Sequence, residues 1–365
     1  MARASKDPGA PKTSYGKGTV VSLFNSTKTP EKPTDVYCPH FWEMKYTNGC
    51  PYSCAWCYLQ GTYRFTTKYN KLNGEMEKDG KAPTHKDREL IRREFEMALK
   101  DRDEPTMFNA GEVGDALNYE NVLMYDVLPL LEKYADKGHK VLLLTKSDSK
   151  RLIGDAMKFT KIRKQIVFAY SVNGPRVAEQ YEVGAPHPYD RLAAASTALA
   201  RGYEVRLRID PIVPIPSWQD DYAQLVDTIM KTTPGVSLIT LGSLRGLAIT
   251  IQAAEARGAD TSWFRYLDKE TEVEGSWGMK MNLKRRVEVY TVLERLLRTR
   301  KYAGPIGLCK ESMELYDAMK RSLLENYCNC MMQAPPKKEA PPASLEAGAR
   351  SLTDGKQVTL VEKGD

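Results

Sequence analysis

Three cysteines in one short loop constrain this chain more than any other feature of its sequence. Cys50, Cys54 and Cys57 have the spacing C-x3-C-x2-C within the stretch NGCPYSCAWCYLQGTYR. This spacing lets one tight loop place three thiolates around a single cubic iron–sulfur cluster. A [4Fe–4S] cube is normally held by four cysteines, so three of them leave one iron open. An open metal position can bind a substrate or a cofactor, as it does in catalytic zinc sites.

Two other uses of these cysteines fit the sequence less well. A zinc site would usually add a second Cys or His pair, and the nearest candidates are Cys38 and His40, upstream of the loop. Disulfides are disfavoured because the chain has seven cysteines, an odd number, and no secretory leader. We therefore expect reduced thiols and a cytoplasmic protein. No apolar run reaches the roughly 18 residues that would predict a membrane span.

The charge balance permits an anionic partner without requiring one. The 365 residues include 54 Lys and Arg against 47 Asp and Glu, a formal net charge of +7. Part of this excess lies in residues 1–36, where we expect an extended or disordered N-terminal arm. The composition is otherwise ordinary for a globular protein, with 42% hydrophobic and 28% charged residues.

Apolar strands and helix-length segments alternate through the middle of the chain. Six segments are predicted strands: residues 41–46, 106–110, 140–145, 165–172, 204–209 and 237–241. Five segments are predicted helices: residues 84–100, 122–135, 150–159, 189–200 and 218–231. Continuously apolar strands separated by helices indicate βαβ units and a parallel sheet. The predicted fold class is therefore α/β.

The sequence changes character after this alternation, which occupies a predicted core of residues 37–246. Residues 247–332 are predicted to be a C-terminal helical extension, irregular at first and then helical over 283–300 and 311–327. Residues 333–365 begin with a proline-rich stretch and contain no aromatic residue, which predicts a disordered tail.

The cysteine loop resembles the signature loop of radical S-adenosylmethionine (SAM) enzymes. The likeness includes Trp56, which the resemblance places beside the adenine of SAM. It implies two cofactors, a [4Fe–4S] cluster and SAM, with SAM chelating the open iron and being cleaved to a 5′-deoxyadenosyl radical. It also implies a partial (β/α)6 barrel with its site at the C-terminal ends of the strands. A doubly wound sheet remains an alternative, because periodicity does not give strand order.

Several strand ends carry residues that this resemblance assigns to SAM. The stretch NAGEVGDAL is similar to the glycine and glutamate motif of the superfamily, so Gly111 and Glu112 would receive the SAM ammonium group. Lys146 in LLLTKSDS and Ser171 in FAYSVNG would meet carboxylate or ribose oxygens. The alternatives are an ordinary turn, in which Asp115 caps a helix, and solvated strand ends.

Three charged residues near the ends of the later strands are candidates for the substrate side. Arg208 and Asp210 lie in RLRIDPIVP, and Arg245 lies in GSLRG. An inward pair of Arg208 and Asp210 would either face the substrate or tie the sheet together. Arg245 would either meet an anionic group or lie on the surface.

Over residues 37–246 the chain resembles the spore photoproduct lyase group of radical SAM proteins. The segments that carry this likeness are CPYSCAWCYL, NAGEVGDAL, LLTKSDS, FAYSVNGPRVAEQYEVGAPHPYDRL, GYEVRLRIDPIVP and ITLGSLRG. The named member of the group splits a thymine dimer and uses a further cysteine, downstream of the cluster loop, as a hydrogen donor. This chain has no cysteine between Cys57 and Cys309. Either a tyrosine or a C-terminal cysteine takes that role, or the reaction differs.

The C-terminal cysteines are Cys309, Cys328 and Cys330. They would supply a hydrogen atom or bind an auxiliary cluster, and the alternative is that they are buried as small apolar residues. Cys309 is the candidate for catalysis, because it lies in GLCKES at the expected edge of the barrel mouth.

Three functions are consistent with these residues. The first is a lyase-like radical SAM enzyme that acts on a macromolecule, by resemblance nucleic acid, with flavodoxin or ferredoxin as reductant. The second keeps the radical chemistry but modifies a peptide or protein precursor. The third is a non-catalytic metal-binding or nucleic-acid-binding protein with a structural site at the three loop cysteines.

Overall fold

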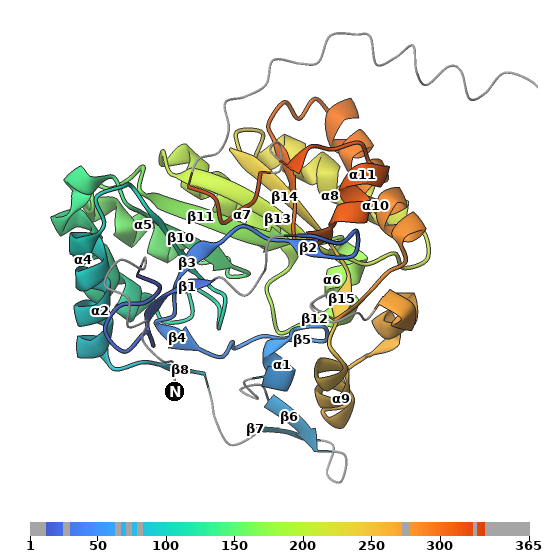
Figure 1. Ribbon diagram of the computed structural model, residues 1–365, viewed down its shortest axis with the longest axis horizontal. Helices are drawn as coiled ribbons and strands as arrows, with labels where there is room; N and C mark the ends of the chain where they lie inside the picture. Colours follow the sequence, from blue (N-terminus) through green and yellow to red (C-terminus); the bar gives the residue numbers. More distant parts are fainter. Residues whose placement is uncertain are drawn as a thin grey trace, which may run out of the picture.

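The structure is a computed structural model that describes residues 12–24, 30–62, 67–70, 75–78, 83–271, 278–323 and 327–332. Its centre is an eight-stranded sheet in the order β1-β3-β9-β10-β11-β13-β14-β17 (Figure 1). The strands are β1 Val21–Phe24, β3 Phe41–Met44, β9 Met107–Ala110, β10 Lys140–Thr145, β11 Ile166–Val172, β13 Glu204–Ile212, β14 Leu238–Ser243 and β17 Ile306–Leu308. β1 runs antiparallel to β3, and all other neighbours in the sheet are parallel.

All six predicted strands are present in this sheet, and their order settles one of the alternatives. The order follows the chain without a reversal, so every crossover steps to the same side. A doubly wound sheet reverses its strand order, and that alternative is therefore wrong. The seventh parallel strand, β17, was not predicted, because its three residues are too few to show a periodic pattern.

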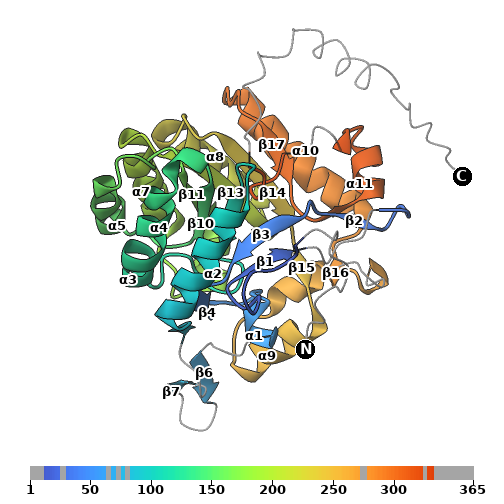
Figure 2. The ribbon, with the colours of Figure 1, turned by 60° about the vertical axis from the view of Figure 1, so that its left-hand side comes forward.

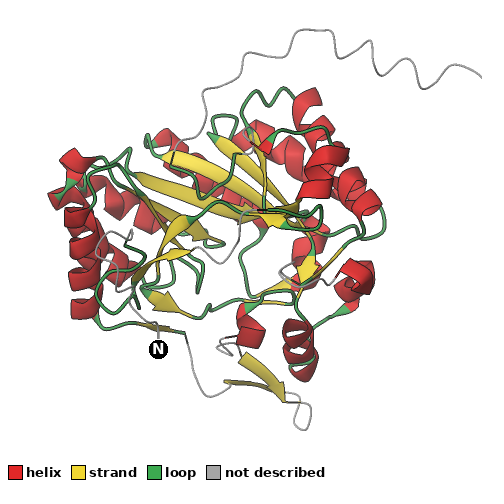
Figure 3. Ribbon diagram, viewed as in Figure 1, coloured by secondary structure: helices red, strands yellow, loops and turns green. Residues whose placement is uncertain are grey.

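A layer of helices covers one face of the sheet (Figures 2 and 3). Its members are α2 Arg88–Asp101, α4 Leu128–Lys133, α5 Lys150–Asp155, α7 Pro188–Ala200, α8 Trp218–Thr232 and α10 Leu283–Thr299. Within this layer α2 contacts α4, α5 contacts α7, and α8 contacts both α7 and α10. The Asp87 carboxylate accepts a hydrogen bond from the Leu90 N–H, and α2 begins at Arg88, four residues later than predicted.

The helix predicted over residues 122–135 is divided into pieces. It consists of α3 Glu120–Val122, a π-helical turn Leu123–Val127, and then α4. Pro129 lies in the first turn of α4 and has no N–H to donate to the preceding turn. The regular hydrogen-bond ladder is therefore interrupted at this point.

Two predictions for the C-terminal extension are wrong. The stretch after Gly246 is not irregular throughout, because it contains helix α9, Ala248–Ala256. The helix predicted over 311–327 is only α11, Met313–Ala318, since Glu311–Ser312 forms strand β18 and pairs with β2, Val36–Tyr37. The buried Glu311 carboxylate, described below, holds this strand in place. The predicted tail, 333–365, lies outside the described residues.

Short elements complete the described fold. The paired strands are β4 Thr47–Asn48 with β8 Thr84–His85, β5 Ser53–Cys54 with β12 Glu182–Val183, β6 Thr67–Asn70 with β7 Glu75–Lys78, and β15 Arg245–Gly246 with β16 Met279–Lys280. Two further helices are α1 Leu59–Thr62 and α6 Pro175–Tyr181. Among the described helices, none combines the length and the apolar character needed to traverse a bilayer.

The predicted N-terminal arm is partly described and lies against the core. Residues 12–24 end in β1, and the buried Glu94 of α2 accepts hydrogen bonds from the N–H groups of Lys17, at 2.9 Å, and Val20, at 2.8 Å. The division of the chain into arm, core, extension and tail stays a prediction.

The two faces of the parallel sheet carry different side chains. Residues such as Phe108, Leu143 and Phe168 point to the helices and belong to the main hydrophobic core. The opposite face carries a separate small cluster, made of Met107, Leu142, Val167 and Ala169. Side chains on a strand alternate between faces, so this second face continues toward the C-terminal strand ends as Gly111, Lys146 and Ser171. The predicted site residues therefore share one face.

Candidate active site

A cavity of 490 Å³ lies at the C-terminal ends of the parallel strands. Its size falls in the usual range for ligand sites, roughly 300–1,000 Å³. It is lined by every site residue predicted from the sequence except Cys309, namely Cys50, Cys54, Trp56, Cys57, Gly111, Glu112, Lys146, Ser171, Arg208, Asp210 and Arg245. Residues scattered between positions 50 and 245 of the sequence are thus brought together.

The cysteine loop forms one wall of the cavity and is held by backbone pairing. β5, which contains Cys54, pairs with β12, and the Ala55 N–H donates to the Tyr181 carbonyl at 2.8 Å. Burial raises the pKa of all three thiols, and that of Cys54 reaches about 12. Backbone N–H groups of Tyr52 and Leu59 oppose this by hydrogen-bonding to Cys50 and Cys57.

The loop thiols do not form a mononuclear metal site. In the described part of the chain, no three His, Cys, Asp or Glu side chains converge as ligands of one ion would. A cubane cluster has a different requirement, because each thiolate binds a separate iron. Cys50, Cys54 and Cys57 line one cavity together, and no other cysteine of the described residues lines it.

Trp56 contributes an aromatic surface to the same wall. Its ring lies 5.4 Å from the Tyr181 ring at an angle of 52°, and the residue is buried. A ring fixed in this way offers a flat apolar surface to a ligand in the cavity.

The turn after β9 packs against the end of β10, and glycine is required there. Gly111 has φ +105°, and a Cβ at this position would lie 2.5 Å from the Leu144 carbonyl oxygen. Gly114 likewise packs directly on the Gly49 carbonyl, next to the first loop cysteine. The Gly111–Glu112 stretch is therefore a close contact between two strand ends and the cysteine loop rather than an ordinary turn.

Asp115 does not cap a helix, contrary to the alternative considered from the sequence. Its carboxylate accepts hydrogen bonds from the Thr145 hydroxyl at 2.7 Å, the Lys146 N–H at 2.7 Å and the Leu117 N–H at 2.9 Å. These bonds fasten the β9 turn to the end of β10. Burial raises the pKa of this carboxyl, and the three donors oppose the rise.

Lys146 points into the cavity wall rather than into solvent. Its ammonium donates to the Ser171 hydroxyl at 2.9 Å and lies 3.6 Å from the Glu182 carboxylate. Glu182 is buried and is also paired with the buried Arg191, at 2.6 Å. The alternative of solvated strand ends is therefore wrong for Lys146 and Ser171. Glu182 was missed because its partner Lys146 comes from a distant segment.

A second wall of the cavity contains a pair of arginines that share one carboxylate. Asp210 accepts from Arg208 at 2.7 and 3.0 Å and from Arg245 at 3.1 and 3.2 Å. These guanidinium groups hold the pKa of Asp210 well below its usual range against the effect of burial. Gly242 packs directly on the Asp210 carboxyl, where a Cβ would collide with it. Arg245 is thus part of the cavity and not a surface arginine.

Cys309 does not line the cavity, but its side chain contacts that of Arg208, which does. Its thiol accepts a hydrogen bond from Arg208 at 3.1 Å, and its carbonyl accepts one from Arg245 at 2.8 Å. The residue is buried. The predicted substrate-side residues therefore form one connected group.

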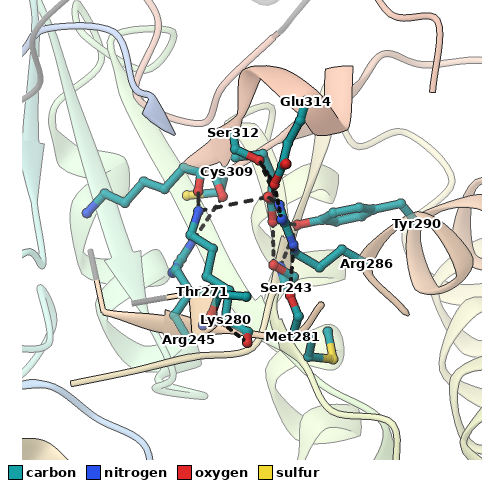
Figure 4. Close-up of polar contacts among 12 residues, drawn as sticks. Ser243, Arg245, Thr271, Lys280, Met281, Arg286, Tyr290, Cys309, Ser312 and Glu314 are labelled. Atoms are coloured by element: carbon teal, nitrogen blue, oxygen red, sulfur yellow. Dashed lines mark hydrogen bonds and ion pairs between the residues drawn. The ribbon is translucent and has the colours of Figure 1, made fainter. Parts of the chain in front are cut away.

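A buried polar network supports this group from the C-terminal extension (Figure 4). Glu311, fully buried, pairs with Arg286 at 2.7 Å and accepts hydrogen bonds from the Tyr290 hydroxyl, at 2.6 Å, and the Ser243 hydroxyl. Lys280 donates to the Lys310 carbonyl at 2.9 Å, and burial lowers its pKa to about 8. The turn that carries Cys309 is thus held by Lys280 at the Lys310 carbonyl and by Arg286 at the Glu311 carboxylate. The sequence did not reveal these residues, because their partners lie up to 68 positions apart.

Two further charged residues, Glu43 and Lys310, line the cavity and were not predicted. Glu43 lies on β3 beside Lys45, whose ammonium is 3.2 Å away. The sequence feature that could have identified Glu43 is its position in FWEM, where a charged residue lies between apolar neighbours in a strand. With these two, the lining of the cavity includes four acidic and four basic side chains: Glu43, Glu112, Asp115, Asp210, Lys146, Arg208, Arg245 and Lys310.

Fold and site together define a class, namely α/β proteins with a parallel sheet and a cysteine-walled cavity at its C-terminal strand ends. Comparison with known proteins identifies the family. The sequence profile of the family described as "Spore photoproduct lyase" matches residues 29–241. The chain belongs to the spore photoproduct lyase family, as its resemblance predicted.

One curated relative shares about a quarter of its residues with the aligned part of this chain. The spore photoproduct lyase of Clostridium acetobutylicum is 24% identical over 198 residues, which cover 51% of this chain and 50% of that protein. The chain therefore spans about half the length of that curated relative.

Two solved structures share the fold. Spore photoproduct lyase complexed with dinucleoside spore photoproduct has a TM-score of 0.56 and 17% identity, over 73% of this chain and 76% of that one. A double mutant with bound AdoMet and dinucleoside spore photoproduct has a TM-score of 0.55 and 16% identity, over 76% and 80%. At such identities the likeness shows only the common mixed α/β fold with its central parallel sheet.

Proposed function

We propose that this protein is a radical SAM enzyme, lyase-like in its chemistry, that acts on a thymine photoproduct in nucleic acid. The observation that carries the proposal is one cavity, in a member of this family, that joins the three loop cysteines to the Arg208–Asp210–Arg245 group. The relatives bind AdoMet and dinucleoside spore photoproduct, and this similarity supports the cofactor and the substrate class.

The residues present fit a [4Fe–4S] cluster and SAM. Cys50, Cys54 and Cys57 offer three thiolates on one wall, two of them already receiving backbone N–H groups, and such hydrogen bonds favour the thiolate form. Gly111 lines the same cavity, and its lack of a side chain allows the turn to pack closely on the end of β10. When bound there, cluster and SAM would supply a 5′-deoxyadenosyl radical that removes a hydrogen atom from the substrate.

The SAM-side residues hold the ends of the methionine moiety. Lys146 is fixed by Ser171 and Glu182 and presents a positive charge for a carboxylate. Glu112 offers an acceptor for the ammonium group, and Trp56 an aromatic surface for the adenine. These roles follow the family motif, position by position.

The substrate-side residues suit a neutral base rather than a phosphate. Asp210 neutralises part of the charge of Arg208 and Arg245, and the cavity as a whole carries equal numbers of acidic and basic side chains. Guanidinium N–H groups that remain free can donate to the carbonyl oxygens of a pyrimidine. Cys309, whose thiol accepts a hydrogen bond from Arg208, would be the thiol that returns hydrogen to the product radical.

Three finer features belong to this proposal. The unreversed strand order, with helices on one face, supports a partial (β/α)6 barrel. A flavodoxin or ferredoxin would deliver the electron, and the reaction would take place in the cytoplasm.

The test is a reaction in the absence of oxygen. The protein, reconstituted with iron and sulfide, is incubated with SAM, dithionite and dinucleoside spore photoproduct. We expect 5′-deoxyadenosine and conversion of the photoproduct to two separate thymine nucleosides, because the bond that is split is the one that joins them. Formation of 5′-deoxyadenosine without any loss of photoproduct would overturn the substrate assignment, and absence of both products would overturn the radical SAM assignment.

A further inference from the structure

Helix α9 packs directly on the helix that follows the cysteine loop. That helix, α1, begins two residues after Cys57. The two helices meet at Gly61, where an added Cβ would lie 2.9 Å from the Ile249 carbonyl carbon and 2.9 Å from the Thr250 backbone nitrogen. Figure 1 shows α1 and α9 side by side below the sheet. The backbone of α9, which belongs to the C-terminal extension, is therefore held against the cysteine wall.

One face of α9 is buried, and this face carries a cation. Thr250, Ala254 and Arg257 follow one another at helical spacing and so share a face. They are 1%, 0% and 7% exposed. Thr250 lines the cavity together with the three loop cysteines. Long side chains on a helix lean toward its N-terminus, which for Arg257 is the direction of Thr250 and the cavity.

The guanidinium group of Arg257 is buried without a partner for two of its three nitrogens. Among the described residues, nothing accepts a hydrogen bond from its Nε or its Nη2, and the buried Thr250 hydroxyl also has no partner. The buried Arg286, in contrast, is paired with Glu311 at 2.7 Å. A buried charge without a partner is costly, so its retention calls for an explanation.

A structural role at the end of α9 does not supply that explanation. An arginine that only terminates a helix would hydrogen-bond the last carbonyls, and Nε and Nη2 of Arg257 bond to none that the structure describes. Burial lowers the pKa of Arg257, and the charges of the Cys57 and Cys54 thiolates raise it. The negative charge that favours the cation therefore comes from the cysteine loop.

We propose that Arg257 is the counter-cation of the anionic iron–sulfur cluster at Cys50, Cys54 and Cys57, and that it makes one-electron reduction of this cluster easier. The inference rests on the proposed radical SAM function and adds a residue from outside the part of the chain that matches the family. Arg257 acts through its charge and is not a ligand, so it is a positioning residue of the metal centre.

The physical reason is electrostatic. A cluster held by three thiolates carries net negative charge, and reduction adds one electron to it. A cation buried close by stabilises the reduced form more than the oxidised form, because attraction grows with charge and is weakly screened in a protein interior. The net charge of a cluster and its surroundings is one of the factors that set its reduction potential. The same buried cation is unfavourable in the protein without a cluster, and this gives the proposal a second, independent consequence.

The first arm of the test uses the full chain without cofactors. Arg257→Met removes the unpartnered charge and keeps most of the apolar bulk, so we expect a folding equilibrium constant about tenfold higher in urea denaturation. Arg286→Met is the matched control, because it removes a buried guanidinium that has a carboxylate partner, and it should lower that constant. A loss of stability in Arg257→Met would show that Arg257 already has a partner in the protein alone and would overturn the inference.

The second arm measures the reduction potential of the cluster in protein reconstituted without oxygen. The cluster is titrated with dithionite, and its reduced form is followed by electron paramagnetic resonance. For Arg257→Met we expect about tenfold less reduced relative to oxidised cluster at a given potential, a shift of about −59 mV for one electron. Arg257→Lys keeps the charge and should stay closer to the unaltered protein. Arg300→Met, which removes a positive charge from an exposed pair with Asp227, should leave the potential unchanged.

The two proposals fail in different ways. If the unaltered protein forms no cluster, the proposed function fails, and the stability measurement in the first arm does not depend on that outcome. If the cluster forms and is reduced at the same potential in Arg257→Met as in the unaltered protein, the assignment of Arg257 alone is overturned.

Discussion

The two walls of the cavity are built in different ways. The cysteine wall is local, since Cys50, Cys54 and Cys57 come from eight consecutive residues and are held mainly by backbone pairing of β5 with β12. The arginine wall is assembled from β13, β15 and the turn at Cys309, and it is held by buried side-chain charges.

This difference shows how one scaffold can keep a cofactor and change a substrate. Backbone pairing depends little on side-chain identity, so the cysteine wall can persist while other residues vary. The arginine wall depends on each member of its network, because a buried charge that loses its partner is costly. We therefore expect changes at the first wall to abolish the metal centre, and changes at the second to affect stability and substrate.

The largest expected effect is at the cysteine wall. Cys54→Ala removes one of the three thiolates. Replacing a residue that only supports a metal ligand lowers metal affinity or activity by up to about 100-fold. We therefore expect loss of a ligand itself to lower cluster content and 5′-deoxyadenosine formation by more than that. Iron and sulfide analysis and the visible absorbance of the cluster measure this loss. Cys38→Ala is the control and should retain the cluster. Equal cluster content in both variants would contradict the comparison.

The next effect is at the arginine wall. Asp210→Asn leaves two buried guanidinium groups without their carboxylate, and we expect a loss of about 3 kcal/mol in the free energy of unfolding at pH 7. Asp227→Asn, which breaks an exposed pair with Arg300, should cost under about 1 kcal/mol. Urea denaturation of both proteins measures the difference, and equal losses would show that burial of the Asp210 group does not matter.

The Asp210 effect also has a predicted pH dependence. The pKa of Asp210 is lower in the folded protein than in the unfolded chain, so its carboxylate stabilises the fold above the unfolded value, about 4. This contribution is lost as pH falls from there through the folded pKa. The stability difference between the unaltered protein and Asp210→Asn should therefore shrink below about pH 4. A difference that stays constant down to pH 3 would contradict this assignment.

A smaller effect is expected where the walls meet the strand ends. Gly111→Ala places a Cβ against the Leu144 carbonyl at φ +105°, and we expect a loss of about 2 kcal/mol. Gly184→Ala is the matched control, because Gly184 has φ +77° but no atom within 4 Å of the added Cβ. Thermal unfolding should separate the two variants. Similar melting temperatures would show that only the backbone angle matters.

The smallest effect is expected at the start of α10. The Asn282 side chain accepts a hydrogen bond from the Arg285 N–H at 2.9 Å and begins α10. Asn282→Ala should cost about 1 kcal/mol in the free energy of unfolding. Cluster content should be unchanged, and a loss of cluster would show that α10 influences the cysteine wall as well.

The same division explains what could be predicted from the sequence. The strands and the cysteine loop were predicted because periodicity and spacing are local, and the strand-end residues followed from the rule that parallel strands end at one edge. Glu182, Lys280 and Glu311 were missed because their importance lies in partners from distant segments. The helix predicted over 311–327 was wrong for this reason too, since Glu311 serves the buried network instead of a helix.

The most direct test of the central claim is the electron paramagnetic resonance spectrum of the reduced, reconstituted protein with and without SAM. If three loop cysteines leave one iron open, the reduced cluster should give a signal that shifts when SAM is added, and Cys54→Ala should lack it. A cluster signal that SAM does not alter would contradict the account.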